Sequence, residues 1–555
     1  MRKVIWTILF ILYHGSFLAQ QSRTVGLLNY DKEKSFDGLN LLFPRGAGHV
    51  YLINNCGEVV HTWVDSSAIV PNQAAYLQPD GSIFIAKGNE PGDTINFEIG
   101  NERIEHRDWD NNLLWSYSVS DSHHKAHHDF KVLPNGNILV IAWELIPYEE
   151  AIAAGRNPAL IPRHRMLSDQ IVEIKPIGKT GGEVVWKWRA WDHLVQNFDS
   201  TKINFGVVEE HAELININYK TYSTKDDWLH INAIDFNQKL NLILLSVPAF
   251  NEIWIIDHST STGQAALHIG GKNRVGGDLW WRWGNPEAYG KGDSSGKKLF
   301  FQHNAHWLKN ELEDNENRNQ NILLFNNFFP DSASSVSMLA PVLDKKNFSH
   351  GKTNYRFLPD SFLWSYTTPE KGKMFSPVAS GVQLLPNGNK LICVGKQGYL
   401  FEIDSMQRVV WEYVVPTKFG VPVAQGTKLA QSDNRIFKVE RYPMNFPGFR
   451  GKDLSGKEPL ELMTDTAFCH ALHNFEVDGK RESVYIYWNK NAQRITLLPL
   501  GNWVSPLVFV LKDSAGSIVS NLSVIGKTEI KTKEWRTGVY HLYFSHILIR
   551  SFYNF

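Results

Sequence analysis

The stretch VVWKW (residues 184–188) shows the pattern that decides the fold: two apolar residues, usually an aromatic residue, a spacer, and then an aromatic residue. Alternate residues of a β-strand point to the same side, so one side of this strand carries both bulky rings. The pattern occurs six times: VVHTW (59–63), LLWSY (113–117), VVWKW (184–188), LWWRW (279–283), FLWSY (362–366) and VVWEY (409–413). Six similar strands spread over most of the chain predict a repeat architecture.

Two further patterns recur beside the aromatic strands. One is an apolar strand, a turn and a second apolar strand, seen in YLQPDGSIFIA (76–86), VLPNGNILVIAW (132–143) and LLPNGNKLICV (384–394), with looser copies at 233–247 and 306–325 and a weak sixth copy at 426–439. The glycine of each Pro-Asp-Gly or Pro-Asn-Gly turn supplies the positive φ angle that a hairpin needs. The other is a short strand before most aromatic strands: VYLIN (50–54), IVEIK (171–175), IWIID (253–257) and LFEID (400–404).

Each repeat thus supplies about four short strands, and closing such units around an axis removes exposed sheet edges. We therefore predict an all-β chain with a six-bladed β-propeller over residues 24–455. The C-terminal part departs from the repeat. We expect a linker at 456–482 and a small C-terminal β-sandwich module at 483–555.

Composition limits the classes of function. The chain has 555 residues, which is long for one ordinary domain unless the fold is a closed ring. Its 57 basic and 57 acidic residues cancel, so nothing in the charge predicts a nucleic-acid partner. Three cysteines leave at least one thiol unpaired in a monomer, so a disulfide framework is not the basis of the fold.

The N-terminus has the features of a secretory signal peptide. Arg2 and Lys3 precede an apolar run from Val4 to Tyr13, and small residues around Ala19 suit cleavage. The apolar run is shorter than the roughly 20 residues that a membrane-spanning helix needs. We predict a signal peptide at residues 1–20 and an exported protein.

Histidines recur at one position of the predicted inner strands. Counting back six residues from Pro134 gives His128, and the same step from Lys309 gives His303. From Asn237 the step reaches Ile231, next to His230. Because the inner strands of all blades line one channel, we expect these three histidines to converge. Imidazole suits proton transfer and nucleophilic attack near neutral pH, so they are the candidate catalytic residues.

Polar residues beside the three histidines complete the predicted site. They are His127, Asn232, Gln302 and Asn304, which we expect to bind substrate by hydrogen bonds to an oxyanion.

Several longer strings resemble one enzyme family. They are DWLHINAIDFN (227–237), EIWIIDHST (252–260), GGDLWWRWGNP (276–286), QHNAHW (302–307), HHDFKVLPNGN (127–137), SGVQLLPNGNKLICVG (380–395) and RYPMNFPGF (441–449). Together they are similar to the arylsulfate sulfotransferases over roughly residues 24–455. The resemblance implies transfer of a sulfuryl group from a phenolic sulfate ester to a phenol, through a transient sulfohistidine. It implies no nucleotide donor, and we predict no cofactor and no metal at the site.

The resemblance transfers to some residues and not to others. The histidine of the family's Asp-Trp-x-His-x-Asn motif falls on His230, and that of its Gln-His motif falls on His303. The family's arginine should follow NILLFNN (321–327), yet no arginine lies between positions 318 and 356. Its sulfated histidine should lie near Val378, yet no histidine lies between positions 350 and 470.

These departures lead to two hypotheses about replacement residues. The covalent role passes to His127, His128, His230 or His303. The missing cation is replaced by Arg441, which we also predict to bind substrate, or by Arg282.

The last 60 or so residues resemble the C-terminal sorting domain of the bacterial type IX secretion system. The matching features are Asp513-Ser514-Ala515-Gly516 after a strand and the later Thr537-Gly538-Val539-Tyr540. The resemblance implies that this module is a partner of the export machinery. It also implies that the protein reaches the periplasm, the cell surface or the medium of a Gram-negative bacterium.

Two other functions stay open at this stage. A metal-dependent enzyme would use SHHKAHHD (122–129) and CHALH (469–473), where His123/His127 and His124/His128 have the spacing of a ligand pair on a helix. A non-catalytic binding protein would keep the propeller without the chemistry, because fold alone does not fix function.

Overall fold

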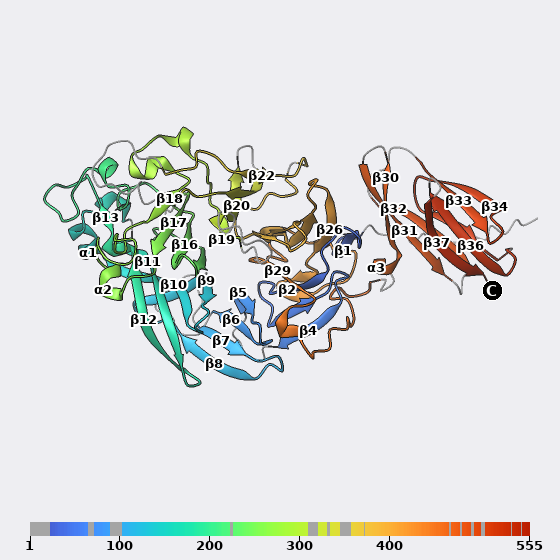
Figure 1. The fold of residues 1–555 in the computed structure, drawn as a ribbon, viewed down its shortest axis with the longest axis horizontal. Coiled ribbons are helices and arrows are strands. Elements are labelled where there is room, and N and C mark those ends of the chain that lie inside the picture. Colours follow the sequence, from blue (N-terminus) through green and yellow to red (C-terminus); the bar gives the residue numbers. More distant parts are fainter. Residues whose placement is uncertain are drawn as a thin grey trace, which may run out of the picture.

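The computed structural model is built almost entirely of antiparallel β-sheets (Figure 1). It describes residues 23–554 except for 65–70, 89–102, 162, 222–225, 309–319, 330–332, 344–356, 371, 465–467, 478–479, 490–492, 501–505, 534 and 545–546. The predicted signal peptide at 1–20 lies outside the described residues. Three short α-helices occur: α1 (Tyr148–Ala153), α2 (Thr262–Ala265) and α3 (Phe468–Ala471). Among the helices of the described residues, none has the length and apolar character to span a membrane.

Six sheets of four or five strands account for residues 26–443 and are numbered here in chain order. Sheets 1 to 3 are β29 (Glu440–Pro443), β2 (Gly38–Leu42), β3 (His49–Ile53) and β4 (Val59–Val64); β5 (Pro71–Leu77), β6 (Ile83–Lys87), β7 (Arg103–Arg107) and β8 (Leu113–Ser118); and β9 (His124–Val132), β10 (Ile138–Pro147), β11 (Arg165–Ile177) and β12 (Gly181–Arg189). Sheet 4 is β15 (Ala233–Asn237), β16 (Leu242–Val247), β17 (Glu252–Asp257) and β18 (Trp281–Trp283), and sheet 5 is β19 (His303–Trp307), β20 (Ile322–Phe329), β21 (Ala333–Leu339) and β22 (Trp364–Tyr366). Sheet 6 is β23 (Gly381–Leu384), β24 (Lys390–Val394), β25 (Tyr399–Ile403), β26 (Val409–Val414) and β1 (Gly26–Tyr30). Two-stranded pairs lie outside them: β13 (Leu194–Val195) with β14 (Ile215–Asn216), and β27 (Thr417–Lys418) with β28 (Val421–Pro422).

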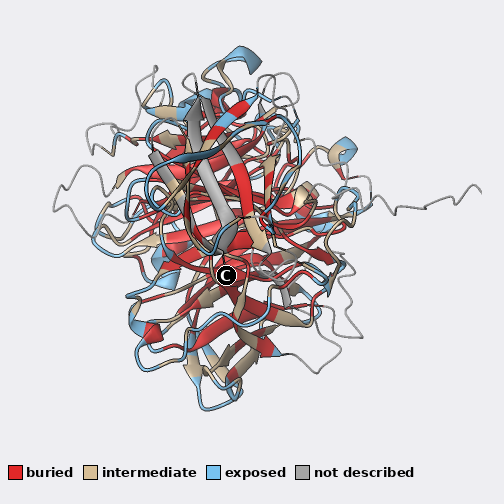
Figure 2. Ribbon diagram, turned by 90° about the vertical axis from the view of Figure 1, so that its right-hand side faces the viewer, coloured by how far each residue is buried: buried red, intermediate tan, exposed pale blue. Residues whose placement is uncertain are grey.

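The sheets follow one another around a closed ring. A buried apolar cluster fills the space between each sheet and the next, and the last of these clusters joins sheet 6 to sheet 1. Buried residues accordingly dominate the strands, and exposed residues gather in the connecting loops (Figure 2). The all-β prediction is confirmed.

Strands from the two ends of the chain close the ring, whereas the sequence predicted a hairpin at 426–439. The weak hairpin predicted at 426–439 is wrong, because no strand occurs in that stretch. Instead β29, from near the end of the ring, pairs with β2, from its beginning. Strand β1 also adds to the outer edge of sheet 6. Two distant parts of the chain therefore complete two of the sheets.

The repeated aromatic strands link most of the sheets to the next sheet by an indole hydrogen bond. Each of the six copies lies in the fourth strand of its sheet, counted from the inside. In five sheets an indole N–H of that strand donates to a backbone carbonyl of the next sheet: Trp63 to Asp108 (3.0 Å), Trp115 to Gly181 (2.8 Å), Trp188 to Gly277 (2.7 Å), Trp281 to Leu358 (3.1 Å) and Trp411 to Asn55 (2.8 Å). In these five copies the motif combines a buried ring with one directional hydrogen bond.

Two further four-stranded sheets lie C-terminal to the ring, at one end of the molecule (Figure 1). They are β30 (Leu472–Val477), β31 (Lys480–Asn489), β32 (Arg494–Leu500) and β35 (Thr528–Lys531), and β34 (Ile518–Val524), β33 (Leu507–Asp513), β36 (Gly538–Phe544) and β37 (Ile547–Asn554). One buried cluster joins the two sheets. Strand β30 lies within the stretch predicted to be a linker, so the two-sheet module begins before residue 483.

A disulfide ties the segment before this module to the ring. It joins Cys56, between β3 and β4, to Cys469 in α3, and the two cysteines are 413 positions apart in the chain. The third cysteine, Cys393, is a buried thiol whose pKa is raised by its burial.

Candidate functional site

The three predicted catalytic histidines come from neighbouring sheets. His128 lies on β9, His230 precedes β15, and His303 begins β19. Strand β15 lies beside both β9 and β19, so the sheets bring these residues to one region of the ring. His128 and His230 have φ angles of +56° and +58°. This conformation strains a residue with a side chain, and such strain concentrates at functional sites.

The rings of His128 and His230 form the centre of the cluster. Their centroids are 4.4 Å apart and the rings meet edge to face. Phe437 lies beside this pair, with its ring centroid 6.2 Å from that of His128 and 6.4 Å from that of His303. The His230 side chain is 31% exposed, whereas His128 is buried. His230 is therefore the ring of the pair that a ligand can reach most readily.

Asp227 orients the His230 ring. The Nδ1 atom of His230 forms a short hydrogen bond with the Asp227 carboxylate. The same carboxylate accepts a hydrogen bond of 3.1 Å from the indole of Trp143. Burial raises the pKa of Asp227, but the charge and hydrogen bond of His230 outweigh that effect and lower it overall. An ionised Asp227 holds a proton on Nδ1 of His230 and turns Nε2 to the opposite side of the ring.

His127 contacts His128 and holds its ring in place. Its Nδ1 lies 2.7 Å from Nδ1 of His128, and its ring stacks on Trp143 at 4.0 Å. Burial lowers the pKa of His127 to about 3 and the pKa of His128 well below its ordinary value, so both rings are neutral.

Asp169 lies on the other side of His127. Its Oδ1 is 2.8 Å from Nε2 of His127, without the alignment of a hydrogen bond. Burial, reinforced by the nearby charge of Asp227, raises the pKa of Asp169 well above its ordinary value. Asp169 therefore lies, as a buried carboxyl with a raised pKa, next to the neutral ring of His127.

His303 uses both of its ring nitrogens within the protein. Nδ1 lies 2.8 Å from the side-chain oxygen of Asn327, and Nε2 accepts a hydrogen bond of 3.2 Å from the backbone N–H of Ala379. Burial lowers the pKa of His303 to about 3. Ala379 follows Val378, near which the family's sulfated histidine was expected. His303 therefore joins sheet 5 to that segment.

The predicted substrate-binding amides form hydrogen bonds between neighbouring sheets. Asn232 donates to the backbone oxygen of Gln302 (2.9 Å), and the Gln302 side chain donates to the backbone oxygen of Glu252 (2.6 Å). Both side chains are completely buried. Asn304 accepts a hydrogen bond of 3.0 Å from the backbone of Val382. The amide nitrogens of Asn232 and Gln302 and the amide oxygen of Asn304 thus hold sheets 4, 5 and 6 together, while the side-chain oxygens of Asn232 and Gln302 have no hydrogen-bond partner among the described residues.

Neither predicted replacement arginine faces the histidines. Arg441 is buried against Glu402 and Asn40, with an ion-pair distance of 2.5 Å to Glu402. Arg282 is buried against Glu252 at the same distance. Each guanidinium neutralises a buried carboxylate, and the role of Arg441 or Arg282 as the cation of the site stays a prediction.

A different arginine, Arg435, supplies positive charge to the cluster. Its charge contributes to lowering the pKa of both His128 and His303, which places the guanidinium within electrostatic reach of both rings. Burial lowers its own pKa to about 10, so it stays charged at neutral pH. Among the described residues no carboxylate forms an ion pair with Arg435. Sequence reasoning missed it because the weak hairpin pattern at 426–439 gave no sign of a functional side chain. Asp227 was within the quoted DWLH string, but Asp169 had no local signal.

A polar cavity of about 200 Å³ lies next to the histidines along the same inner strands. Asp129, which follows His128, and Asn304, which follows His303, line it. Its charged residues are largely paired, with Lys131 at 2.6 Å from Asp235 and Lys438 at 3.0 Å from Asp129. The cavity therefore offers little unpaired positive charge for a sulfate.

The described residues of the two histidine-rich strings lose the ligand arrangements that were considered for them. SHHKAHHD leads into and lies mostly in β9, where residues four apart are too distant to share an ion as they would on a helix. In CHALH, Cys469 is in the disulfide and offers no thiolate.

Comparisons with known structures give only distant similarity. A protein of unknown function from Bacteroides caccae is 14% identical, with 73% of this chain and 98% of that chain covered and a TM-score of 0.37. The virginiamycin B lyase of Staphylococcus aureus is 9% identical, with 75% and 99% covered and a TM-score of 0.31. The search of curated proteins found no significant match.

The comparison with protein families is decisive. The family described as arylsulfotransferase (ASST) matches residues 49–428, which span most of the six-sheet ring and include every histidine of the cluster. The chain therefore belongs to the arylsulfotransferase (ASST) family.

Proposed function

We propose that the protein is an aryl-sulfate sulfotransferase that moves a sulfuryl group from a phenolic sulfate ester to a phenol by way of His230. The observation that carries this proposal is the arrangement of His230: a partly exposed imidazole, held at Nδ1 by Asp227 and edge to face with His128 at 4.4 Å. A nucleophilic histidine needs a ring that is held in one orientation and that a substrate can reach, and the His230 side chain is 31% exposed. Membership of the family supports sulfuryl transfer as the reaction.

In the first half of the reaction, Nε2 of His230 attacks the sulfur of the donor. The S–N bond forms as the bond between sulfur and the phenolic oxygen breaks. The phenolate leaves and takes a proton from water. Asp227 balances the positive charge that the sulfated imidazole acquires. Arg435 faces the negative charge on the sulfuryl oxygens, as cationic groups do in phosphoryl transfer.

In the second half, the acceptor phenol replaces the donor. Its oxygen attacks the sulfur, its proton passes to His128, and the S–N bond breaks to restore neutral His230. The lowered pKa of His128 keeps it neutral before the transfer and releases the proton to water afterwards. His127 and Asp169 hold His128 in place. His303, Asn232, Gln302 and Asn304 are positioning residues, because their polar groups bind neighbouring sheets.

This assignment gives the covalent role to a residue other than the one that the family pattern predicts. The segment near Val378 has no histidine, and its backbone binds His303. The alternative is a non-catalytic binding protein that has the family's scaffold. The same departure from the family pattern favours it, so the test must separate the two functions.

The test is an assay of the purified mature protein with p-nitrophenyl sulfate as donor and phenol as acceptor. We expect release of nitrophenol that depends on phenol. The variant His230→Ala should lose at least about 100-fold in turnover, since it removes the nucleophile. Arg435→Gln should lose about 100-fold through weaker stabilisation of the transferred group.

His211→Ala is the matched control, because His211 is also paired with a carboxylate, Glu213, at 3.0 Å but lies outside the cluster. It should retain wild-type turnover. A folded wild-type protein that is inactive with several phenolic acceptors would support the binding protein. Activity that survives in His230→Ala would overturn the role of His230.

We further propose how the whole chain is organised and where it works. The six sheets are the blades of a six-bladed β-propeller, and the two C-terminal sheets form a β-sandwich that serves in export through type IX secretion. The Cys56–Cys469 disulfide supports an oxidising compartment outside the cytoplasm. Phenolic sulfates and phenols are the partners of the site, and no nucleotide cofactor takes part.

A further inference from the structure

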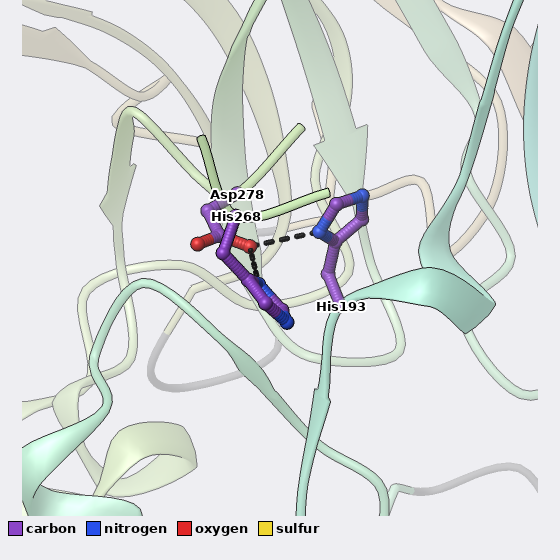
Figure 3. A group of neighbouring side chains, drawn as sticks. All are labelled: His193, His268 and Asp278. Carbon is purple, nitrogen blue, oxygen red and sulfur yellow. Dashed lines mark hydrogen bonds and ion pairs between the residues drawn. The ribbon is translucent and has the colours of Figure 1, made fainter. Parts of the chain in front are cut away.

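A second cluster of histidine and carboxylate side chains lies away from the candidate active site (Figure 3). His193 follows η2 (Ala190–Asp192) at the end of sheet 3, while His268 and Asp278 belong to the connection between α2 and β18 of sheet 4. One ligand atom from each residue lies within 4.8 Å of the others. Three segments of two sheets therefore bring three metal-binding groups to one point.

The hydrogen bonds of the cluster indicate that it holds more positive charge than two neutral imidazoles would supply. Nε2 of His193 lies 2.8 Å from the backbone oxygen of Ala265, which only accepts, so Nε2 carries a proton. Nδ1 of the same ring lies 2.8 Å from Oδ1 of Asp278, and Nδ1 of His268 lies 2.7 Å from that same oxygen. Two imidazole nitrogens thus converge on one carboxylate oxygen, and either protons or a cation must lie between them.

The surroundings of His193 match those of a metal ligand. Metal-binding histidines commonly donate their other N–H to a backbone carbonyl, which fixes the tautomer and the ring orientation, as Ala265 does here. The ring is completely buried, lies parallel to Trp188, and has Gly277 so close that a side chain at that position would collide with it. His193 is therefore held rigidly with Nδ1 towards the cluster.

We propose that His193, His268 and Asp278 bind a zinc ion. Two imidazoles and a carboxylate are ligands that Zn²⁺ prefers, and tetrahedral binding places ligand atoms about 3.3 Å apart. The two Nδ1–Oδ1 separations of 2.8 and 2.7 Å need a small opening, and all three ligand atoms already lie within 4.8 Å of one another. The His268 side chain is 59% exposed, so it can make that movement and leave the fourth position to water.

The location of the site indicates that the ion would link two neighbouring sheets. It joins sheet 3, which carries His127 and His128, to sheet 4, which His230 immediately precedes. The Trp188 indole already joins the same two sheets through the carbonyl of Gly277, next to Asp278. Zinc at this point would hold sheets 3 and 4 together, and these two sheets position His128 and His230. The proposal does not depend on the reaction assigned to that pair.

The experiment uses the full mature chain, stripped with a chelator and titrated with zinc chloride. We expect wild type to retain one more zinc ion per chain than His268→Gln or Asp278→Asn after desalting. Its apparent affinity at this site should exceed theirs by at least about 100-fold. Zinc should raise the unfolding temperature of wild type and have a much smaller effect on either variant. Cobalt bound at the same site should give visible absorption bands that both variants lack.

His164→Asn is the control, because His164 is an exposed histidine with a φ angle of +54° that asparagine tolerates. It should bind zinc as wild type does. If wild type, His268→Gln and Asp278→Asn retain equal zinc while their circular dichroism shows the same fold, the proposal is wrong. In that case protons alone hold the cluster together.

Discussion

At the scale of the residue, the account depends on how Asp227 controls His230. The carboxylate accepts hydrogen bonds from His230 and from Trp143, and these contacts fix one face of the imidazole. The sequence predicted His128, His230 and His303 because they occur near one register position of separate repeats. It could not assign different roles to them, since the role of His303 comes from partners such as Asn327 and Ala379, which are distant in the chain.

Replacing Asp227 with asparagine tests this control. The amide can still contact Nδ1, but it does not favour the positively charged sulfated ring. We expect Asp227→Asn to lower kcat by about 100-fold or more, with little change in KM for the donor. Glu213→Gln removes the carboxylate of the comparable His211 pair and should leave kcat unchanged. Equal kcat values for Asp227→Asn and wild type would contradict the assigned role.

Burial of His303 makes a prediction about stability and pH. The unfolded residue takes up a proton near pH 6.5, whereas its folded pKa is about 3. Between these values the unfolded state binds more protons, so stability is fully present above pH 6.5 and is lost as the pH falls. The slope is at most about 1.4 kcal/mol per pH unit for this residue.

The measurement is urea unfolding of wild type and His303→Gln at several values between pH 7.5 and 4.5. The variant should lose less stability than wild type over this range, although it is less stable at pH 7.5. His211→Ala, at a partly exposed position outside the cluster, should follow wild type. A variant with the pH dependence of wild type would show that His303 is not buried in its neutral form.

At the scale of the element, the aromatic motif was the most informative part of the sequence. Its alternation predicted six strands, and the structure has all six as fourth strands of their sheets. The motif can be recognised in the sequence because one local pattern supplies both the buried ring and, in most copies, the indole donor. The stretch 426–439 misled the prediction because its apolar residues pack without forming a strand, and the inner strand of that sheet comes from 440–443.

Trp411 links the last sheet of the ring to the first, because its indole N–H donates to the backbone oxygen of Asn55 in sheet 1. We expect Trp411→Phe to lower the free energy of unfolding by about 1–3 kcal/mol, since a buried carbonyl loses its partner. Trp364→Phe is the comparison. Trp364 lies in the corresponding strand of sheet 5, and among the described residues its indole has no hydrogen bond of this kind. Chemical unfolding measures the stability of both variants. An equal destabilisation would show that the Trp411–Asn55 hydrogen bond does not contribute to stability.

At the scale of the whole molecule, the ring is closed by contacts between the two ends of its chain. Strand β29 pairs with β2, β1 pairs with β26, and the disulfide fastens Cys469 to the loop after β3. Local sequence patterns could not predict these pairings, since each depends on segments about 380 to 415 residues apart. The odd number of cysteines showed only that one thiol remains, and the structure identifies it as Cys393.

Removal of the disulfide should therefore destabilise the closed ring. We expect Cys56→Ala with Cys469→Ala to lower stability by about 2–5 kcal/mol, and a reductant should lower the unfolding temperature of wild type but not of this double variant. Cys393→Ala should keep the response to reductant. A wild-type unfolding temperature that does not respond to reduction would show that the cross-link contributes nothing to closure.

The central claim is that sulfur is carried covalently by His230. The most direct measurement is mass spectrometry of the protein mixed with p-nitrophenyl sulfate in the absence of an acceptor and digested under mildly alkaline conditions that preserve sulfohistidine. We predict one sulfuryl group on the peptide that contains His230, absent in His230→Ala and discharged when phenol is added. A sulfuryl group on the peptide with His127 and His128, or a protein that turns over without any labelled histidine, would contradict the account.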